Sequence, residues 1–287
     1  MRVKFPAYRR YKAARVAASD SLMALLIGAR LGEHALSTSP ADPSARLPEL
    51  FGRIPGIDRV NRTVTDAARL LADAEHHLAS MGVPYVLGVQ GAFVGETITM
   101  LREDREDDAS ATRSIPWRAD PNDVPLSEIH EYVAERCGRA LPAESLQIFH
   151  LARRIRNRIV HFAGAAGSRL PGEYRSLPVD AKARWEDIAG RPLTIDRHGQ
   201  LRLAEGELIA VLATTRLLAQ AVNAMLVDTL SREYWSELVV SDYRALEPQR
   251  FGERSQRMRR LVGHARTIYG AIGLTRDELQ ASLDAMS

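Results

Sequence analysis

The stretch ESLQIFHLARRIRNRIVHFA, residues 144–163, indicates the fold class of the chain. Its apolar residues recur at steps of three and four, the spacing of one face of an α-helix. They are Ile148, Leu151, Ala152, Ile155, Ile159 and Phe162. The opposite face is polar over about 16 Å of helix. It carries His150, Arg154, Asn157, Arg158 and His161. We therefore expect an amphipathic helix with one face in a core and the other facing a partner.

Helical spacing dominates the rest of the chain as well. We expect helices over residues 19–31, 59–81, 84–101, 127–136, 142–163, 181–189, 205–230, 231–239 and 253–286, the last broken near Gly273. Gly82 and Pro84 indicate the end of one helix and the start of the next. The glycine- and proline-rich stretches 39–55 and 164–172 indicate loops.

One segment has the alternation of a β-hairpin. Apolar residues alternate on both sides of a turn at Arg197-His198-Gly199, which predicts a hairpin near residues 192–203. The expected fold class is all-α, an antiparallel helical bundle with this one small hairpin. The chain divides by pattern into an N-terminal helical extension (1–58), a helical bundle (59–239) and a basic helical tail (240–287).

The composition is that of a soluble globular protein. Hydrophobic residues make up 45% and charged residues 26% of the 287 positions, and the net charge is only +3. All but three of the 39 basic residues are arginine, a bias that codon usage alone can produce, so only the placement of the arginines is informative. Cys137 is the single cysteine, which excludes an intrachain disulfide and fits a reducing cytoplasm.

The sequence offers little for a membrane, a metal or a cofactor. The apolar stretch 208–230 is interrupted by Arg216, Gln220 and Asn223, which favours a buried helix over a membrane span. The Glu75-His76-His77 run lacks the spacing that brings metal ligands together. The glycines between residues 88 and 95 are not followed by the lysine of a phosphate-binding loop. We expect no metal, no cofactor and no membrane association.

The region around the polar helix face is strongly positive. No Asp or Glu lies between Glu144 and Glu173, whereas the interval holds five arginines: Arg153, Arg154, Arg156, Arg158 and Arg169. These charges need a partner, which is an acidic segment of the chain, a second protein or a nucleic-acid backbone. The acidic residues 103–108 form either a solvated linker or a lid over this site. Arg153, Arg154, Arg158 and His150 are therefore candidate RNA-binding residues, unless they belong to a solvated surface.

The positions Arg156-Asn157-Arg158-Ile159-Val160-His161 resemble the signature of the HEPN family, which is Arg, a polar residue that is often Asn, three further residues and His. The resemblance covers these six positions and, loosely, the bundle over residues 59–239. It implies a HEPN-like helical fold and a metal-independent endoribonuclease that cuts RNA through its own 2′-hydroxyl. A toxin or antiviral defence effector is the corresponding biological role.

The chemistry of these side chains suits that reaction. Imidazole gains and loses protons near neutral pH, so His161 is the candidate acid/base group. Guanidinium stays charged and pairs with two phosphate oxygens, so Arg156 is the candidate stabiliser of the phosphorane. Asn157 lies one turn before His161 and can orient the imidazole or the substrate. Arg156 lies about 140° from His161 around an ideal helix of about 100° per residue, so its side chain must curl toward the site.

The expected partners follow from the same reasoning. The resemblance implies a two-fold homodimer in which two motifs line one cleft, and an antitoxin or regulatory protein is a further possible partner. Two alternatives remain open. One is a non-catalytic HEPN-like module that binds RNA or a partner protein through an exposed basic face. The other is a structural or regulatory helical protein in which His161 is buried or Arg156 is held in a structural salt bridge.

Overall fold

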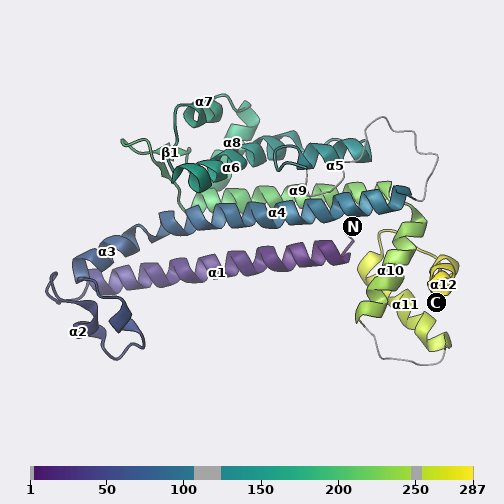
Figure 1. Cartoon of the computed structure of the whole chain (residues 1–287), viewed down its shortest axis with the longest axis horizontal. Helices are drawn as coiled ribbons and strands as arrows, with labels where there is room; N and C mark the ends of the chain where they lie inside the picture. Colours follow the sequence, from purple (N-terminus) through teal and green to yellow (C-terminus); the bar gives the residue numbers. More distant parts are fainter. Residues whose placement is uncertain (1–2, 107–123, 247–253, 287) are drawn as a thin grey trace. The chain divides into compact units, whose positions relative to one another are not determined.

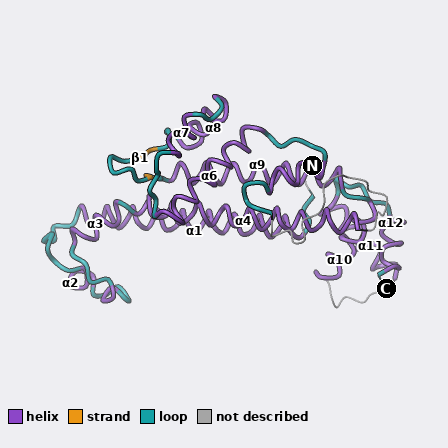
Figure 2. The backbone as a smooth tube through the Cα atoms, turned by 45° about the horizontal axis from the view of Figure 1, so that its top comes forward, coloured by secondary structure: helices purple, strands orange, loops and turns teal. Residues whose placement is uncertain are grey.

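The computed structural model describes residues 3–106, 124–246 and 254–286. These residues form an all-α bundle with one small two-stranded sheet, as predicted (Figures 1 and 2). The helices are α1 (Pro6–Ser37), α2 (Leu47–Phe51), η1 (Ile57–Arg59), α3 (Val64–Ala72), α4 (Ala74–Glu106), α5 (Ile129–Cys137), α6 (Ala143–Phe162), α7 (Arg169–Arg175), α8 (Val179–Ala189), α9 (Glu205–Thr229), α10 (Arg232–Leu246), α11 (Arg254–Tyr269) and α12 (Arg276–Ala285).

The chain divides into two compact units, each built from several segments. The first unit comprises residues 1–15, 87–153 and 214–287, and the second comprises residues 16–86 and 154–213. The helices α1, α4, α6 and α9 each contribute one end to either unit. The three-part division expected from the sequence, with boundaries near residues 58 and 239, stays a prediction.

Aromatic packing organises the core of the first unit. The rings of Phe5 and Trp235 lie 5.9 Å apart, and those of Tyr11 and Phe93 lie 4.9 Å apart. The Asn223 amide pairs with both backbone groups of Val3, at 3.2 and 2.8 Å. These contacts explain why α1 begins at Pro6, whereas the sequence predicted a start at residues 19–20. The aromatic N-terminal residues become helical because the core packs them there.

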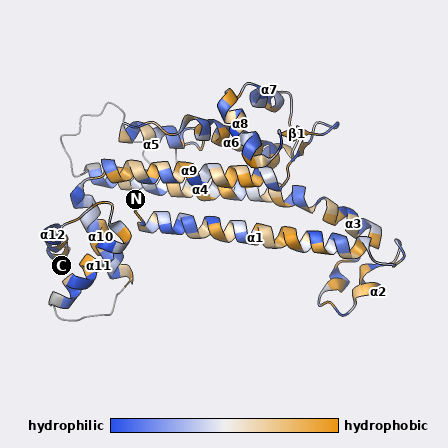
Figure 3. Ribbon diagram, turned by 180° about the vertical axis from the view of Figure 1, so that it is seen from behind, coloured by the Kyte–Doolittle hydropathy of each residue, from blue (hydrophilic) through white to orange (hydrophobic). Residues whose placement is uncertain are grey.

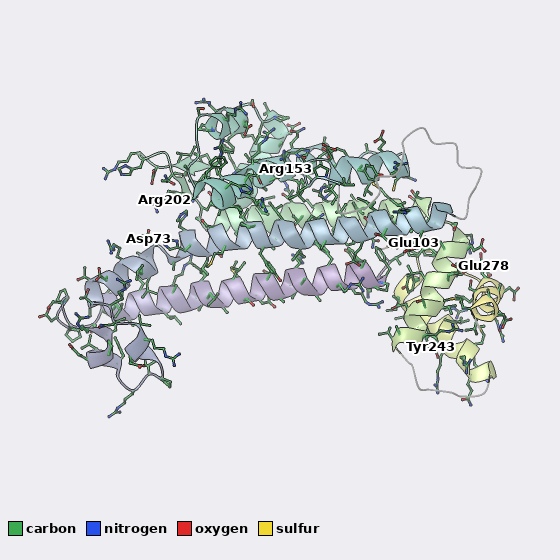
Figure 4. All side chains as sticks on the ribbon, in the orientation of Figure 1. Asp73, Glu103, Arg153, Arg202, Tyr243 and Glu278 are labelled. Carbon is green, nitrogen blue, oxygen red and sulfur yellow. The ribbon has the colours of Figure 1, made fainter. Side chains whose placement is uncertain are left out.

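A buried ion cluster joins the C-terminal helices to α1 in the same unit. Asp242 on α10 accepts hydrogen bonds from Arg9 at 2.9 and 2.5 Å and from the Tyr269 hydroxyl at 2.8 Å, and it lies 3.1 Å from His264. Burial raises the pKa of the Asp242 carboxyl, but these hydrogen bonds outweigh burial and hold the pKa below its ordinary value. Arg232 pairs with Glu278 in the first turn of α12. Glu278 is labelled in Figure 4.

The hairpin belongs to the second unit. Strands β1 (Thr194–Ile195) and β2 (Leu201–Arg202) pair antiparallel, which confirms the hairpin predicted near residues 192–203. The buried carboxylate of Glu207 on α9 accepts two bonds from Arg191, at 2.8 and 3.1 Å. Arg202 lies 3.8 Å from Asp73, and both are labelled in Figure 4. The hairpin is therefore tied to α9 and to the segment between α3 and α4.

Four further local predictions were wrong. The helix expected over residues 59–81 begins only at Val64, and it is divided at Asp73 between α3 and α4. The predicted break at Gly82 and Pro84 does not occur, because α4 runs through both residues. Gly82 serves close packing instead, since an added Cβ would lie 2.9 Å from a methyl group of Leu22 and of Leu208. Two predicted loops contain short helices, α2 and α7. Pro171 lies in the first turn of α7, where backbone N–H groups have no acceptor within the helix, so a proline without an N–H removes no helical hydrogen bond.

Two helices are long and apolar enough to cross a membrane by composition alone. They lie over residues 74–104 and 205–229, and their apolar positions are coloured orange in Figure 3. In the most apolar 18-residue stretch of each helix, 44% of the residues are buried in the first helix and 61% in the second. Core helices of soluble proteins pass the same test, so this observation is weak evidence for a membrane.

Candidate functional site

The three motif residues converge at the C-terminal end of α6. The Arg156 side chain curls around the helix, and its Nη1 atom lies 3.3 Å from Nε2 of His161. The same Nη1 atom donates a hydrogen bond of 3.1 Å to Oδ1 of Asn157. A guanidinium only donates, so the contact with the imidazole requires that His161 Nε2 carry no proton. The side chain of Asn157 therefore orients the arginine, one of whose nitrogens faces both partners.

This end of α6 is open to solvent. His161 is exposed, and Arg156 and Asn157 are half-buried. Upstream, Ile148, Leu151, Ala152 and Ile155 are buried as the apolar stripe predicted. The prediction was wrong for Phe162, which is 55% exposed, and Val160 beside the motif is 47% exposed. The core that covers the middle of the helix thus ends before its last turn.

The charges around the motif are largely uncompensated. Arg154 lies 3.6 Å from Glu173, a long ion pair with both side chains partly exposed. Within the described parts of the chain, no carboxylate pairs with Arg156, Arg158 or Arg169. The site therefore keeps fixed positive charge on an exposed surface, which is the electrostatic condition for binding a phosphate group.

Two of the predicted RNA-binding residues lie earlier on α6, in the first unit. Nε2 of His150 is 2.6 Å from Oε1 of Glu131, and the His150 side chain is mostly buried. Arg153, labelled in Figure 4, is half-buried. The structure does not place His150 on an open surface, because α5 supplies the carboxylate that holds it.

A second buried histidine lies close to His150. Nε2 of His130 is 2.9 Å from the Gln90 amide nitrogen, so the imidazole accepts that hydrogen bond. Burial lowers the pKa of His130 to about 3, and nearby His150 contributes to the same effect. His130 is therefore neutral throughout the physiological range and belongs to the core of the first unit.

The β-hairpin is bonded to the loop that follows the motif. Ala163 adopts a left-handed conformation with φ of 49°, and Gly164 follows with φ of 85°. The Leu201 N–H donates to the Gly164 carbonyl, and the Ala166 N–H donates to the Gly199 carbonyl, each at 2.9 Å. The sequence predicted both elements but gave no signal that they would be neighbours, since that contact is set by the tertiary fold.

The hairpin turn is held by Asp196 and presents basic residues. Oδ1 of Asp196 accepts from the backbone N–H groups of His198 and Gln200, at 2.8 and 2.9 Å. These bonds, with a contact from Arg202, keep the pKa of the Asp196 carboxyl below its ordinary value. Arg197 and His198 are exposed, and the Arg197 Nε donates to His198 at 3.1 Å. The turn is thus held in one conformation by Asp196, and it exposes the positive charge of Arg197.

The remaining candidates have structural partners. Among the described residues, no group of three or more His, Cys, Asp or Glu could hold a metal ion. Glu75 and His76 accept backbone hydrogen bonds from Glu205 and Leu203, at 2.8 and 3.2 Å. Of the acidic stretch 103–108, Glu103 accepts from Tyr234 and Asp104 from Ser231, whereas Asp107 and Asp108 lie outside the described residues.

Comparison with known proteins adds no further assignment. No protein-family model, no curated protein and no solved structure matches this chain. The functional interpretation therefore depends on the geometry of the site and on the resemblance of its motif.

Proposed function

We propose that this chain is a HEPN-type, metal-independent endoribonuclease that cuts RNA at the Arg156–His161 pair. One observation carries the proposal: Nη1 of Arg156 lies 3.3 Å from Nε2 of an exposed His161 on a surface where Arg156 has no described carboxylate partner. A structural role for the motif predicts a buried His161 or a salt-bridged Arg156, and a passive docking surface requires no convergence of the two side chains. The observed geometry favours a catalytic pair.

The proposed reaction needs no metal. A base removes the proton of the RNA 2′-hydroxyl, and the 2′-oxygen forms a bond to the adjacent phosphorus. The bond from phosphorus to the 5′-oxygen breaks, and that oxygen receives a proton. The products are a 2′,3′-cyclic phosphate and a 5′-hydroxyl. His161 carries the proton, Arg156 stabilises the extra negative charge of the phosphorane, and Asn157 holds Arg156 in position.

One imidazole cannot act as base and acid in the same step. We therefore propose a homodimer in which two copies of the motif face one cleft and each His161 takes one proton transfer. The proposed setting is cytoplasmic, as a toxin or antiviral effector held in check by an antitoxin or another regulatory protein. These assignments come from the motif resemblance. Sedimentation of the purified chain tests the dimer directly.

The deciding experiment is cleavage of total RNA by the purified chain in excess EDTA. The variants are Arg156→Ala and His161→Ala, with Arg184→Ala as a matched control, because Arg184 is an exposed arginine whose single ion pair among the described residues is with Asp187. We expect cleavage by wild type and control with 2′,3′-cyclic phosphate ends, and a loss of about 100-fold or more in both motif variants.

Two other results would change the assignment. Equal cleavage by wild type and His161→Ala would exclude His161 as the acid/base group. RNA binding without cleavage, weakened by Arg156→Ala, would instead support the non-catalytic HEPN-like binding module. Circular dichroism of each variant establishes that a loss of activity is not a loss of fold.

A further inference from the structure

Phe162 is an unusual residue to find on a surface beside a reactive histidine. It is the last residue of α6, directly follows His161 and exposes 55% of its surface. Large aromatic side chains are mostly buried in folded proteins, because removing them from water is favourable. Single exposed apolar residues are common on protein surfaces, so the exposure of Phe162 is informative only together with the charged groups that surround it.

The structure holds an arginine against this ring. The guanidinium carbon of Arg158 lies 4.7 Å from the centroid of Phe162. Gly167 makes room for that guanidinium, since a Cβ at residue 167 would lie 3.1 Å from Nη1 of Arg158. Its φ of +64° also favours glycine at this position. Phe162 and Arg158 thus form a preassembled pair of flat groups, one apolar and one positively charged.

The surrounding charge indicates what covers this pair. Arg156, Arg169 and the hairpin residue Arg197 have no carboxylate partner among the described residues. A second copy packed across a two-fold axis at Phe162 would bring its Arg158 against the first, so in the proposed dimer this pair lines the open cleft and not the contact between the copies. A nucleic-acid strand supplies a partner for the arginines, because its phosphates are negative, and a partner for the Phe162 ring, because its bases have flat π faces.

The strand must be single-stranded to use this surface. In an RNA duplex the base faces are stacked and the edges are paired, so a phenylalanine ring cannot reach a base face. An unpaired base can rotate out and stack on an aromatic ring or on a guanidinium plane. We propose that Phe162 and Arg158 form a base-stacking platform beside His161, which takes one unpaired base of the RNA while a flanking phosphate contacts Arg197. This inference rests on the proposed ribonuclease function.

Binding can be tested without cleavage in the full chain carrying His161→Ala. The probes are a fluorescein-labelled single-stranded oligoribonucleotide and the same oligonucleotide annealed to its complement. Added to this background are Phe162→Leu, which stays apolar but loses the ring, and Phe162→Trp, which keeps an aromatic ring. Stacking on an aromatic side chain contributes about 1–3 kcal/mol per base, so Phe162→Leu should weaken single-strand binding by about 5- to 150-fold. Phe162→Trp should restore it.

Further readouts separate stacking from charge and from self-association. Phe162→Leu should leave the salt dependence of RNA binding unchanged. Arg197→Gln should reduce the slope of the logarithm of affinity against the logarithm of salt concentration by about one. The duplex should bind weakly to every variant. Unchanged single-strand affinity in Phe162→Leu would overturn the platform. A change in sedimentation with unchanged RNA affinity would also overturn it and assign the surface to a second copy.

The outcome also separates this inference from the proposed function. If wild type cleaves RNA and Phe162→Leu cleaves equally well, the platform is wrong and the ribonuclease assignment stands. If wild type neither cleaves nor binds any of these RNAs, both fail together.

Discussion

The stability of Phe162→Ala, compared with that of Ile155→Ala, tests whether the motif end of α6 is open. Both residues belong to the apolar stripe that the sequence places in the core. The structure separates them, because Ile155 is 1% exposed and Phe162 is 55% exposed. Truncating a buried isoleucine to alanine costs about 2–5 kcal/mol, since it removes packed methyl groups and leaves a cavity.

The expected cost for Phe162 is smaller. Full burial of a phenylalanine side chain contributes about 1.5–3 kcal/mol, and less than half of that applies to a side chain that is mostly exposed. The cation–π contact with Arg158 adds about 0.5 kcal/mol at an exposed site. We therefore expect Phe162→Ala to lower the free energy of unfolding by no more than about 2 kcal/mol.

Urea unfolding followed by circular dichroism measures both variants, with midpoints compared at a shared slope. Ile155→Val is the matched control and should cost about 0.5–1.5 kcal/mol. A loss in Phe162→Ala as large as that in Ile155→Ala would show that the ring is packed in the core. The open site and the stacking platform would then both be wrong.

Three further predictions concern single positions. Ala163→Gly should stabilise the fold by about 0.5 kcal/mol in the same urea titration. The left-handed φ of 49° costs alanine about 1 kcal/mol, and the greater conformational freedom of glycine in the unfolded chain offsets part of that gain. Asp242→Asn should cost about 3 kcal/mol at neutral pH, since it breaks the buried pair with Arg9. Hydrogen bonds hold the pKa of the Asp242 carboxyl below its ordinary value in the folded state, so this stabilisation is present above the ordinary carboxyl pKa and is lost as pH falls through the lowered pKa. The unfolding midpoints of wild type and variant should therefore converge in acid. Asn157→Asp should reduce kcat/KM for RNA more than Asn157→Ala does, because a carboxylate beside Arg156 competes with the substrate phosphate.

Local signals predicted much of the fold. The hairpin near residues 192–203 was predictable because the aspartate and glycine of its turn, Asp196 and Gly199, act within a few residues of themselves. The convergence of Arg156 with His161 was expected from the motif, because helix geometry alone places the two positions about 140° apart and the long arginine side chain has to curl around the helix. These predictions needed no knowledge of what packs against the element.

The predictions that were wrong depended on distant residues. Gly82 and Pro84 carry the local signals of a helix end, yet α4 runs through both, and Leu22 and Leu208 occupy the space beside Gly82 that a side chain would need. Phe162 has the spacing of a core residue, but periodicity records only which face of a helix is apolar. It does not record where along that face the neighbouring helices stop. The exposure of Phe162 was therefore invisible to sequence reasoning.

The resting contact between Arg156 and His161 defines how the proposed site responds to substrate. In the structure, one guanidinium nitrogen faces two neutral acceptors, Oδ1 of Asn157 and Nε2 of His161. A phosphate oxygen is charged and accepts a stronger hydrogen bond from guanidinium than either neutral group does. An incoming phosphate should therefore draw Arg156 away from the imidazole and free Nε2 for proton transfer. The same exchange would give the arginine its charged partner and the histidine its reactive nitrogen, so binding of the substrate would itself assemble the catalytic arrangement.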